Sequence, residues 1–300
     1  MDMTQNKCCR RVANLRRRRR RRRKILRSII FSCSIIAVAV FVAVGSSMIR
    51  SGDGRTNKYD VEAGNNTYDN AVIENSKISE KNKIQNNQSM LDDIMNSTQY
   101  PKQLKDLALK NEEALEFVYD YPAEHVKEHT IDLAEEASMD SVPLFVQWDK
   151  RWGYEKYSGN FFAASGCGPT TLSMVVVYLT HNREASPIAV AKYSKEAGYS
   201  VDGSGSSWTL ISEGSMHYGV KAKTVALDES RMKAELDEGH PIVVNVGPGD
   251  FTDTGHFMVI TGYDDEGFSI NDPNSIEKSG KRWLFKNISS QIRAVWSMYV

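Results

Sequence analysis

The chain has 300 residues, and its 38 lysines and arginines balance 38 aspartates and glutamates, so the formal net charge is zero. That balance hides an uneven distribution. Residues 1–28 hold 13 of the bases and one acid, which leaves 25 bases and 37 acids in the rest of the chain. Length alone allows about two domains, but the first hundred residues do not have the composition of a packed core. With only four cysteines, the chain is not a disulfide-stapled scaffold.

Residues 29–49 form an uncharged segment dominated by Ile, Val, Phe and Ala. At about 1.5 Å per helical residue, this segment spans about 30 Å, the thickness of bilayer hydrocarbon. The basic flank 1–28 predicts a cytoplasmic N-terminus whose arginines contact anionic lipid, with the C-terminal body outside the membrane. A cleaved signal peptide, with small residues at 43–45, and a nucleic-acid-binding or nuclear-import tract are the alternatives. We favour the uncleaved signal anchor, because the basic flank 1–28 and the apolar run 29–49 are both long for a signal peptide. We expect no nucleic acid partner.

Residues 50–100 are rich in Asn, Ser, Lys, Asp and Gly with isolated apolar residues, a composition that predicts a disordered stalk. Apolar residues at helical spacing then predict a helix or helix pair over 102–119, which Pro122 would end. A second short amphipathic piece is expected within 124–138. Residues 101–141 are therefore a helical spacer, or a lid or pro-segment folded against the body that follows.

Residues 142–300 are expected to form one compact domain. Helical patterns come first, and alternating β-branched residues follow. The expected helices are 169–180, 187–197, 207–218, 229–238 and a closing helix at 288–295. The expected strands are 221–227, 242–246, 257–263, 268–271 and 282–285, with a hairpin turn at Asp265-Glu266-Gly267. Helices followed by an antiparallel sheet predict an α+β domain, with the helical layer presenting Cys167 to the sheet.

Cys167 stands between two glycines, directly before the helix expected at 169–180. A helix N-terminus stabilises a thiolate and lowers the thiol pKa, and the glycines would let a substrate backbone approach. The other three cysteines lie at or before residue 33, in the predicted cytoplasmic tail and membrane segment, so Cys167 has no disulfide partner in its own compartment. It is then either buried and inert or a nucleophile, and its setting favours the nucleophile.

A cysteine nucleophile needs a base, usually a histidine. His256 opens a clear strand pattern, and Asp272 follows the next strand sixteen residues later. The start of one antiparallel strand lies near the end of its partner, so we expect these two residues to be neighbours. Asp272 would accept the Nδ1 proton of His256 and favour the imidazolium. His217 and His240 are the rival bases, each without a carboxylate in an equally rigid setting.

A tetrahedral intermediate also needs hydrogen-bond donors for its oxyanion. The backbone N–H of Cys167 would be one donor, and Gln147 is the best-placed side-chain amide upstream. Glu213, Asp250 and Asp253 are candidates to line the cleft. No metal or cofactor is expected, because the histidines and the cysteine lack ligand spacing and no Gly-rich phosphate loop precedes a lysine.

Four blocks of the segment 142–300, in this order, resemble the C39-like family of papain-fold cysteine peptidases, relatives of the leader-cleaving domains of bacteriocin exporters. The blocks are Gln147-Trp148-Asp149-Lys150-Arg151-Trp152, Gly166-Cys167-Gly168-Pro169-Thr170, Gly255-His256-Phe257 and Asn271-Asp272-Pro273. The resemblance implies a papain-like fold, with Cys167 as nucleophile, His256 as base, Asp272 as the residue that orients it and Gln147 as oxyanion donor.

Together these features predict a membrane-tethered, extracytoplasmic cysteine peptidase on a Gram-positive bacterial surface, acting on a peptide or protein substrate. One alternative is a thiol-dependent cell-wall amidase or endopeptidase, or a transglutaminase-like acyl transferase, although the Asp-Cys-Ser-Gly signature of common wall endopeptidases is absent. Another is a non-catalytic binding module, which would have no reason to retain the Cys, His, Asp and Gln together. The sequence leaves the substrate undetermined.

Overall fold

The computed structural model describes residues 67–300, and residues 68–300 form one compact unit. The predicted basic tail 1–28, the predicted anchor 29–49 and the first part of the predicted stalk lie outside the described residues. Among the helices of residues 67–300, none has both the length and the apolar character needed to cross a bilayer.

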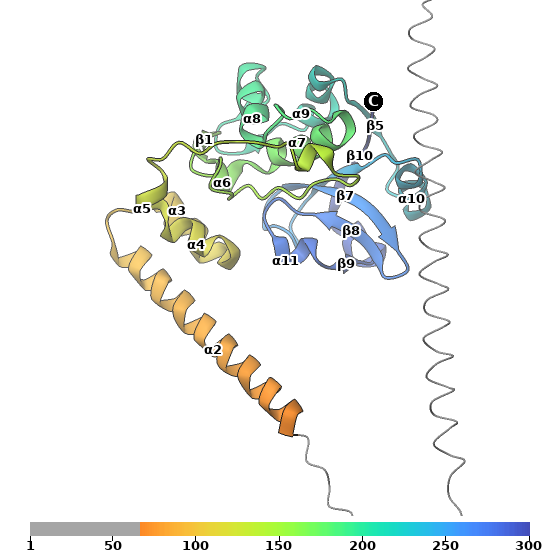
Figure 1. Ribbon diagram of the computed structural model, residues 1–300. Helices are drawn as coiled ribbons and strands as arrows, with labels where there is room; N and C mark the ends of the chain where they lie inside the picture. Colours follow the sequence, from red (N-terminus) through yellow and green to blue (C-terminus); the bar gives the residue numbers. More distant parts are fainter. Residues whose placement is uncertain (1–66) are drawn as a thin grey trace, which may run out of the picture. The chain divides into compact units, whose positions relative to one another are not determined.

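The central element is a six-stranded sheet with the order β5-β10-β6-β7-β8-β9, in which every neighbouring pair is antiparallel (Figure 1). Its strands are β5 (Lys221–Thr224), β6 (Ile242–Val246), β7 (His256–Asp264), β8 (Gly267–Asn271), β9 (Arg282–Trp283) and β10 (Ile292–Tyr299). Two short hairpins accompany it: β1 (Lys156–Tyr157) with β2 (Asn160–Phe161), and β3 (Ser200–Val201) with β4 (Gly205–Ser206). The expected α+β class, with helices preceding an antiparallel sheet, is confirmed.

Most of the helices precede the sheet in the chain (Figure 1). Before residue 140 they are α2 (Thr67–Asn96), α3 (Lys102–Lys110), η1 (Glu112–Ala114), α4 (Leu115–Tyr119), α5 (Tyr121–Glu124) and η2 (Glu136–Ser138). The next group is α6 (Phe162–Ser165), α7 (Cys167–Thr180), α8 (Pro187–Glu196), α9 (Thr209–Ser212), η3 (Gly214–Tyr218) and α10 (Glu229–Asp237). Three short helices lie among the last strands: α11 (Ile276–Ser279), α12 (Phe285–Ile288) and η4 (Ser289–Gln291).

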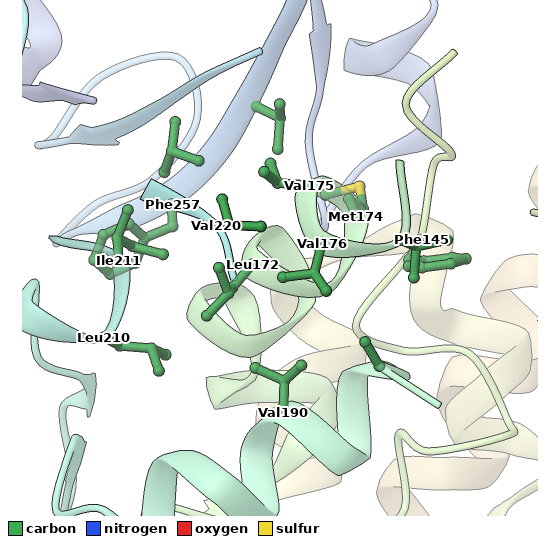
Figure 2. Close-up of a cluster of buried hydrophobic side chains, with 14 of the residues drawn as sticks. Phe145, Leu172, Met174, Val175, Val176, Val190, Leu210, Ile211, Val220 and Phe257 are labelled. Carbon is green, nitrogen blue, oxygen red and sulfur yellow. The ribbon is translucent and has the colours of Figure 1, made fainter. Parts of the chain in front are cut away.

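The sheet is buried on both faces at β6, where every residue is buried and successive residues point to opposite sides. Val243 of β6 belongs to the apolar cluster around α7, whereas its neighbour Val244 belongs to the cluster that contains α10. Figure 2 shows Leu172 and Val176 of α7 packed among side chains of α8, α9 and the sheet. Burying one such side chain contributes about 1.5–3 kcal/mol. The position of α7, and of Cys167 at its first residue, is therefore strongly fixed.

The closing helix expected at 288–295 is wrong. Its first residues end α12 and form η4, and the chain then continues as β10, which pairs with both β5 and β6. Val295 packs in the α10 cluster and Trp296 in the α7 cluster. This alternation between two buried faces favours a strand, because neighbours on a helix lie about 100° apart and do not point to opposite sides.

Two other helix predictions hold, and one is divided. The expected helices 187–197 and 229–238 are confirmed by α8 and α10. The helix expected at 207–218 is two pieces, α9 and η3, separated by Glu213, and Gly214 is the first residue of η3. A Cβ at Gly214 would lie 3.0 Å from the ring of Tyr199, so the glycine permits this close packing while weakening a continuous helix.

The predicted disordered stalk 50–100 differs from the structure over its second part, where α2 runs from Thr67 to Asn96. The chain has no glycine or proline between Gly64 and Pro101 to interrupt a helix. At its C-terminal end, Ile94 is fully buried in an apolar cluster with α3 and α4. This packing with α3 and α4 stabilises the C-terminal end of the polar helix α2, which its composition alone does not predict.

Residues 101–141 pack against the domain that follows them. The apolar cluster of α3 and α4 includes Phe161 and Ala163, and the ring of Phe117 stacks on Tyr154 with centroids 4.2 Å apart. The amphipathic piece expected within 124–138 is wrong, because only the short η2 forms there. Leu133 and Ala137 are instead buried in the α7 cluster and anchor a mostly irregular segment.

The β7–β8 hairpin turns at Asp265 and Glu266, as expected. Gly267 has a φ of +134°, and a Cβ there would lie 2.6 Å from the backbone oxygen of Trp283. Only glycine satisfies both conditions. This hairpin has His256 at the start of β7 and Asp272 directly after β8.

Candidate active site

Cys167 is the first residue of α7 and is partly buried. Its two glycine neighbours are needed for packing: a Cβ on Gly166 would lie 2.6 Å from the Phe162 ring, and one on Gly168 would lie 2.5 Å from the Ser206 hydroxyl oxygen. The sequence suggested that these glycines give a substrate access. In the structure, they let the start of α7 pack closely on its neighbours.

His256 pairs with Val246 at the first position of β7 and is 5% exposed. Its Nε2 lies 2.7 Å from Oδ1 of Asp272, so the expected proximity of the two residues is confirmed. The expected ring nitrogen is wrong, because the carboxylate faces Nε2 and not Nδ1. His256 and Cys167 each favour the charged form of the other, and Asp272 leaves Nδ1 as the ring nitrogen available to the thiol.

Asp272 is fully buried. Its Oδ1 accepts hydrogen bonds from His256 and from the backbone N–H of Asn274, the latter at 2.8 Å. Within residues 67–300, its Oδ2 has no hydrogen-bond partner. One oxygen of the carboxylate therefore carries both contacts that fix it beside the imidazole.

The electrostatics favour a thiolate–imidazolium pair. Burial opposes the charged imidazole, but the charge and hydrogen bond of Asp272, together with Cys167, outweigh it and raise the pKa of His256 to about 10. Burial likewise opposes the thiolate. The hydrogen bond and charge of His256, with hydrogen bonds to the backbone of Phe257 and Gly168, nevertheless hold the pKa of Cys167 below its ordinary value. Both pKa shifts therefore favour the charged form of their group.

Gln147 is buried and lines the same cavity as Cys167 and His256. Its Nε2 donates to the backbone oxygen of Ala163 at 2.7 Å, and its backbone N–H donates to the oxygen of Pro273 at 2.7 Å. Within the described part of the chain, its Oε1 has no hydrogen-bond partner. One of the two amide hydrogens is thus occupied by Ala163, and the other remains for a group in the cavity.

The cavity beside Cys167 has a volume of about 500 Å³ and extends well beyond the residues that the sequence singled out. The loop before β7 contributes Asp250 and Asp253, as expected, whereas Glu213 does not line it. A third wall comes from α3 and the residue after it: Gln103, Asp106, Leu107, Lys110 and Asn111. The sequence carries no signal for this wall, because an amphipathic helix does not indicate which distant site its polar face borders.

The rival histidines are placed elsewhere. The ring of His217 stacks on that of Tyr193 with centroids 4.1 Å apart. His240 does have a carboxylate beside it, because its Nδ1 lies 3.1 Å from a carboxylate oxygen of Glu235. Neither histidine lines the cavity that contains Cys167.

Residues 139–300, more than half of the chain, match the sequence model of the Peptidase_C39 like family. The chain belongs to this family. The expected resemblance to C39-like peptidases is thereby confirmed, and membership supports a peptidase of the cysteine type. The four site residues predicted from the sequence all lie within the matched segment.

Two solved structures are similar to the chain. One is the peptidase domain of Streptococcus ComA, described as a bi-functional ABC transporter involved in a quorum-sensing pathway; it is 20% identical, with a TM-score of 0.37, over 45% of this chain and 90% of that one. The other is a putative C39-like peptidase from Bacillus anthracis, 17% identical with a TM-score of 0.33, over 53% of this chain and 95% of that one. Among curated proteins, no significant match was found.

Proposed function

We propose that the chain is a cysteine peptidase that hydrolyses peptide bonds of a peptide or protein substrate through Cys167, His256 and Asp272. The observation that carries this proposal is the continuous series of contacts from the thiol to the imidazole to the buried carboxylate, beside one cavity. Membership of the Peptidase_C39 like family supports the same class of reaction.

In the proposed acylation step, Sγ of the Cys167 thiolate attacks the carbonyl carbon of the scissile bond, and the electron pair of the C=O bond moves to its oxygen. The C–N bond then breaks while the Nδ1 proton of His256 passes to the leaving amine. In deacylation, water attacks the thioester and His256 takes its proton. The C–S bond breaks, the acid is released, and the thiolate–imidazolium pair is restored.

Gln147 is the proposed side-chain donor to the oxyanion, together with the backbone N–H of Cys167. This role is supported by the place of Gln147 on the wall of the cavity and by the contact with Ala163, which fixes the amide through one hydrogen and leaves the second. A donor already fixed before the reaction stabilises developing charge without reorganising.

A direct assay separates the candidate activities. Purified protein is incubated with a peptide library and, separately, with purified peptidoglycan, and new amino termini are identified by mass spectrometry. We expect cleavage of library peptides that is lost after treatment with iodoacetamide. Products from peptidoglycan alone would instead assign a cell-wall amidase or endopeptidase, and no product from either would favour the binding module.

We also propose that residues 29–49 anchor the protein in the membrane, with the basic residues of 1–28 on anionic lipid and the catalytic domain outside. The support is the uncharged apolar run and its basic flank. Brief protease treatment of intact cells should release an active fragment that contains Cys167, while a cytoplasmic marker stays intact. Complete protection of the domain until the cells are lysed would contradict this topology.

A further inference from the structure

Asn111 joins α3 to η1, and its side chain forms hydrogen bonds in two directions. Its Nδ2 donates to the backbone oxygen of Asn274 at 2.9 Å and to the side-chain oxygen of Asn274 at 3.1 Å. Its Oδ1 accepts from the backbone N–H of Glu113 at 3.0 Å. Asn274 in turn donates its own N–H to the Oδ1 of Asp272 that also bonds His256. A single residue therefore separates Asn111 from the buried carboxylate of the triad.

Glu113 reaches the other end of the same turn. Its carboxylate accepts from the hydroxyl of Ser275 and from the backbone N–H groups of Ile276, at 2.7 Å, and Glu277, at 3.1 Å. The first N–H groups of a helix have no partner within that helix, and a carboxylate from a different segment satisfies them here. Asn111 and Glu113 together thus hold the middle and the C-terminal end of the turn 272–276 that begins with Asp272.

The segment that provides these two residues is itself fixed to the domain. The Tyr154 hydroxyl donates to the backbone oxygen of Phe117 at 2.8 Å, in addition to the stacking of the two rings. Lys150 pairs with Asp120 at 2.6 Å. Leu115 and Val118 are buried in the apolar cluster that includes side chains of the domain. Because the segment that carries Asn111 and Glu113 is fixed to the domain, its hydrogen bonds restrict the motion of the turn 272–276.

We propose that Asn111 and Glu113 are positioning residues of the active site, which hold the turn 272–276 so that Asp272 keeps His256 aligned with Cys167. The inference rests on the proposed function, because alignment matters to catalysis only if this triad acts. Both residues precede the segment 139–300 that matches the family. Two residues outside the matched segment therefore support Asp272. They act through the turn 272–276 and do not contact the reacting atoms.

The test uses the full chain with Glu113→Ala, Asn111→Ala and the conservative Glu113→Asp. Glu116→Gln is the matched control, an exposed acid on the same segment with no contact to the turn. We expect faster hydrogen–deuterium exchange in the peptide 272–279 for both alanine variants. Their kcat should fall roughly tenfold to a hundredfold, the cost of a small misplacement, with KM nearly unchanged. Weaker support of the imidazolium should also move Cys167 alkylation to higher pH, and Glu113→Asp should recover part of each effect.

The outcomes separate this inference from the function on which it rests. Unchanged exchange would overturn it, as would faster exchange with wild-type alkylation and kcat profiles. If the two residues only stabilised the fold, the alanine variants would have a lower denaturation midpoint, and the pH dependence of Cys167 alkylation would stay in place. If the wild-type protein cleaves no peptide, the proposed function fails, while exchange and the pH dependence of Cys167 alkylation still decide whether these two residues position the triad.

Discussion

Cys167→Ala is expected to abolish peptide hydrolysis, with kcat/KM falling by at least about 10³-fold, because no other group replaces the nucleophile. His256→Ala should cost nearly as much, since the thiolate depends on the imidazolium beside it. Residues that act as one unit are not additive, so the double variant should be no worse than Cys167→Ala alone. The measurement is steady-state hydrolysis of a library peptide that the wild-type protein cleaves.

Alkylation by iodoacetamide gives a second, site-specific measurement. Mass spectrometry of the peptide that contains Cys167 should show rapid modification at neutral pH in the wild-type protein and slow modification in His256→Ala. The matched control replaces the other three cysteines, Cys8, Cys9 and Cys33, with serine and should leave both hydrolysis and labelling intact. Cys167→Ala with more than a tenth of wild-type activity, or a Cys167 that reacts only after denaturation, would contradict the nucleophile assignment.

The sequence predicts that His256 and Asp272 are neighbours, because this proximity depends on the local pattern of one hairpin. Residue type and hairpin geometry bring His256 and Asp272 together, as the structure confirms. Pattern alone does not determine which ring nitrogen faces the carboxylate, because the side-chain rotamer depends on packing around His256. The expectation of Nδ1 failed for that reason.

Other parts of the fold depend on distant contacts that no local pattern encodes. The last strand, β10, is stabilised by two neighbouring strands and two buried faces, and the helix prediction for 288–295 failed because it did not take these distant contacts into account. Similarly, Asn111 and Glu113 contact residues more than 160 positions later in the chain. Nothing in their own surroundings identifies either as part of the site.

Asp272→Asn should narrow the pH range of activity from both sides. The carboxylate is the largest of the effects that raise the pKa of His256 against the effect of burial. An uncharged amide therefore lowers that pKa, and the alkaline limb of kcat/KM moves to lower pH. A weaker imidazolium stabilises the thiolate less, so the pKa of Cys167 rises and the acidic limb moves to higher pH. At neutral pH we expect kcat/KM to fall roughly a hundredfold to ten-thousandfold, the range typical of acid–base assistance.

Asp272→Ala separates the effect of charge from that of position. Asparagine retains an oxygen that can accept from His256 and from the N–H of Asn274, whereas alanine leaves both buried donors without a partner. Activity should therefore decrease in the order wild type, asparagine, alanine, and the free energy of unfolding should fall most for alanine. Asp265→Asn, an exposed carboxylate at the opposite end of the same hairpin, is the matched control and should behave as wild type. If both limbs of the pH profile stay in place in Asp272→Asn, the charge of Asp272 does not hold the thiolate–imidazolium pair, and the carboxylate serves only to orient the ring.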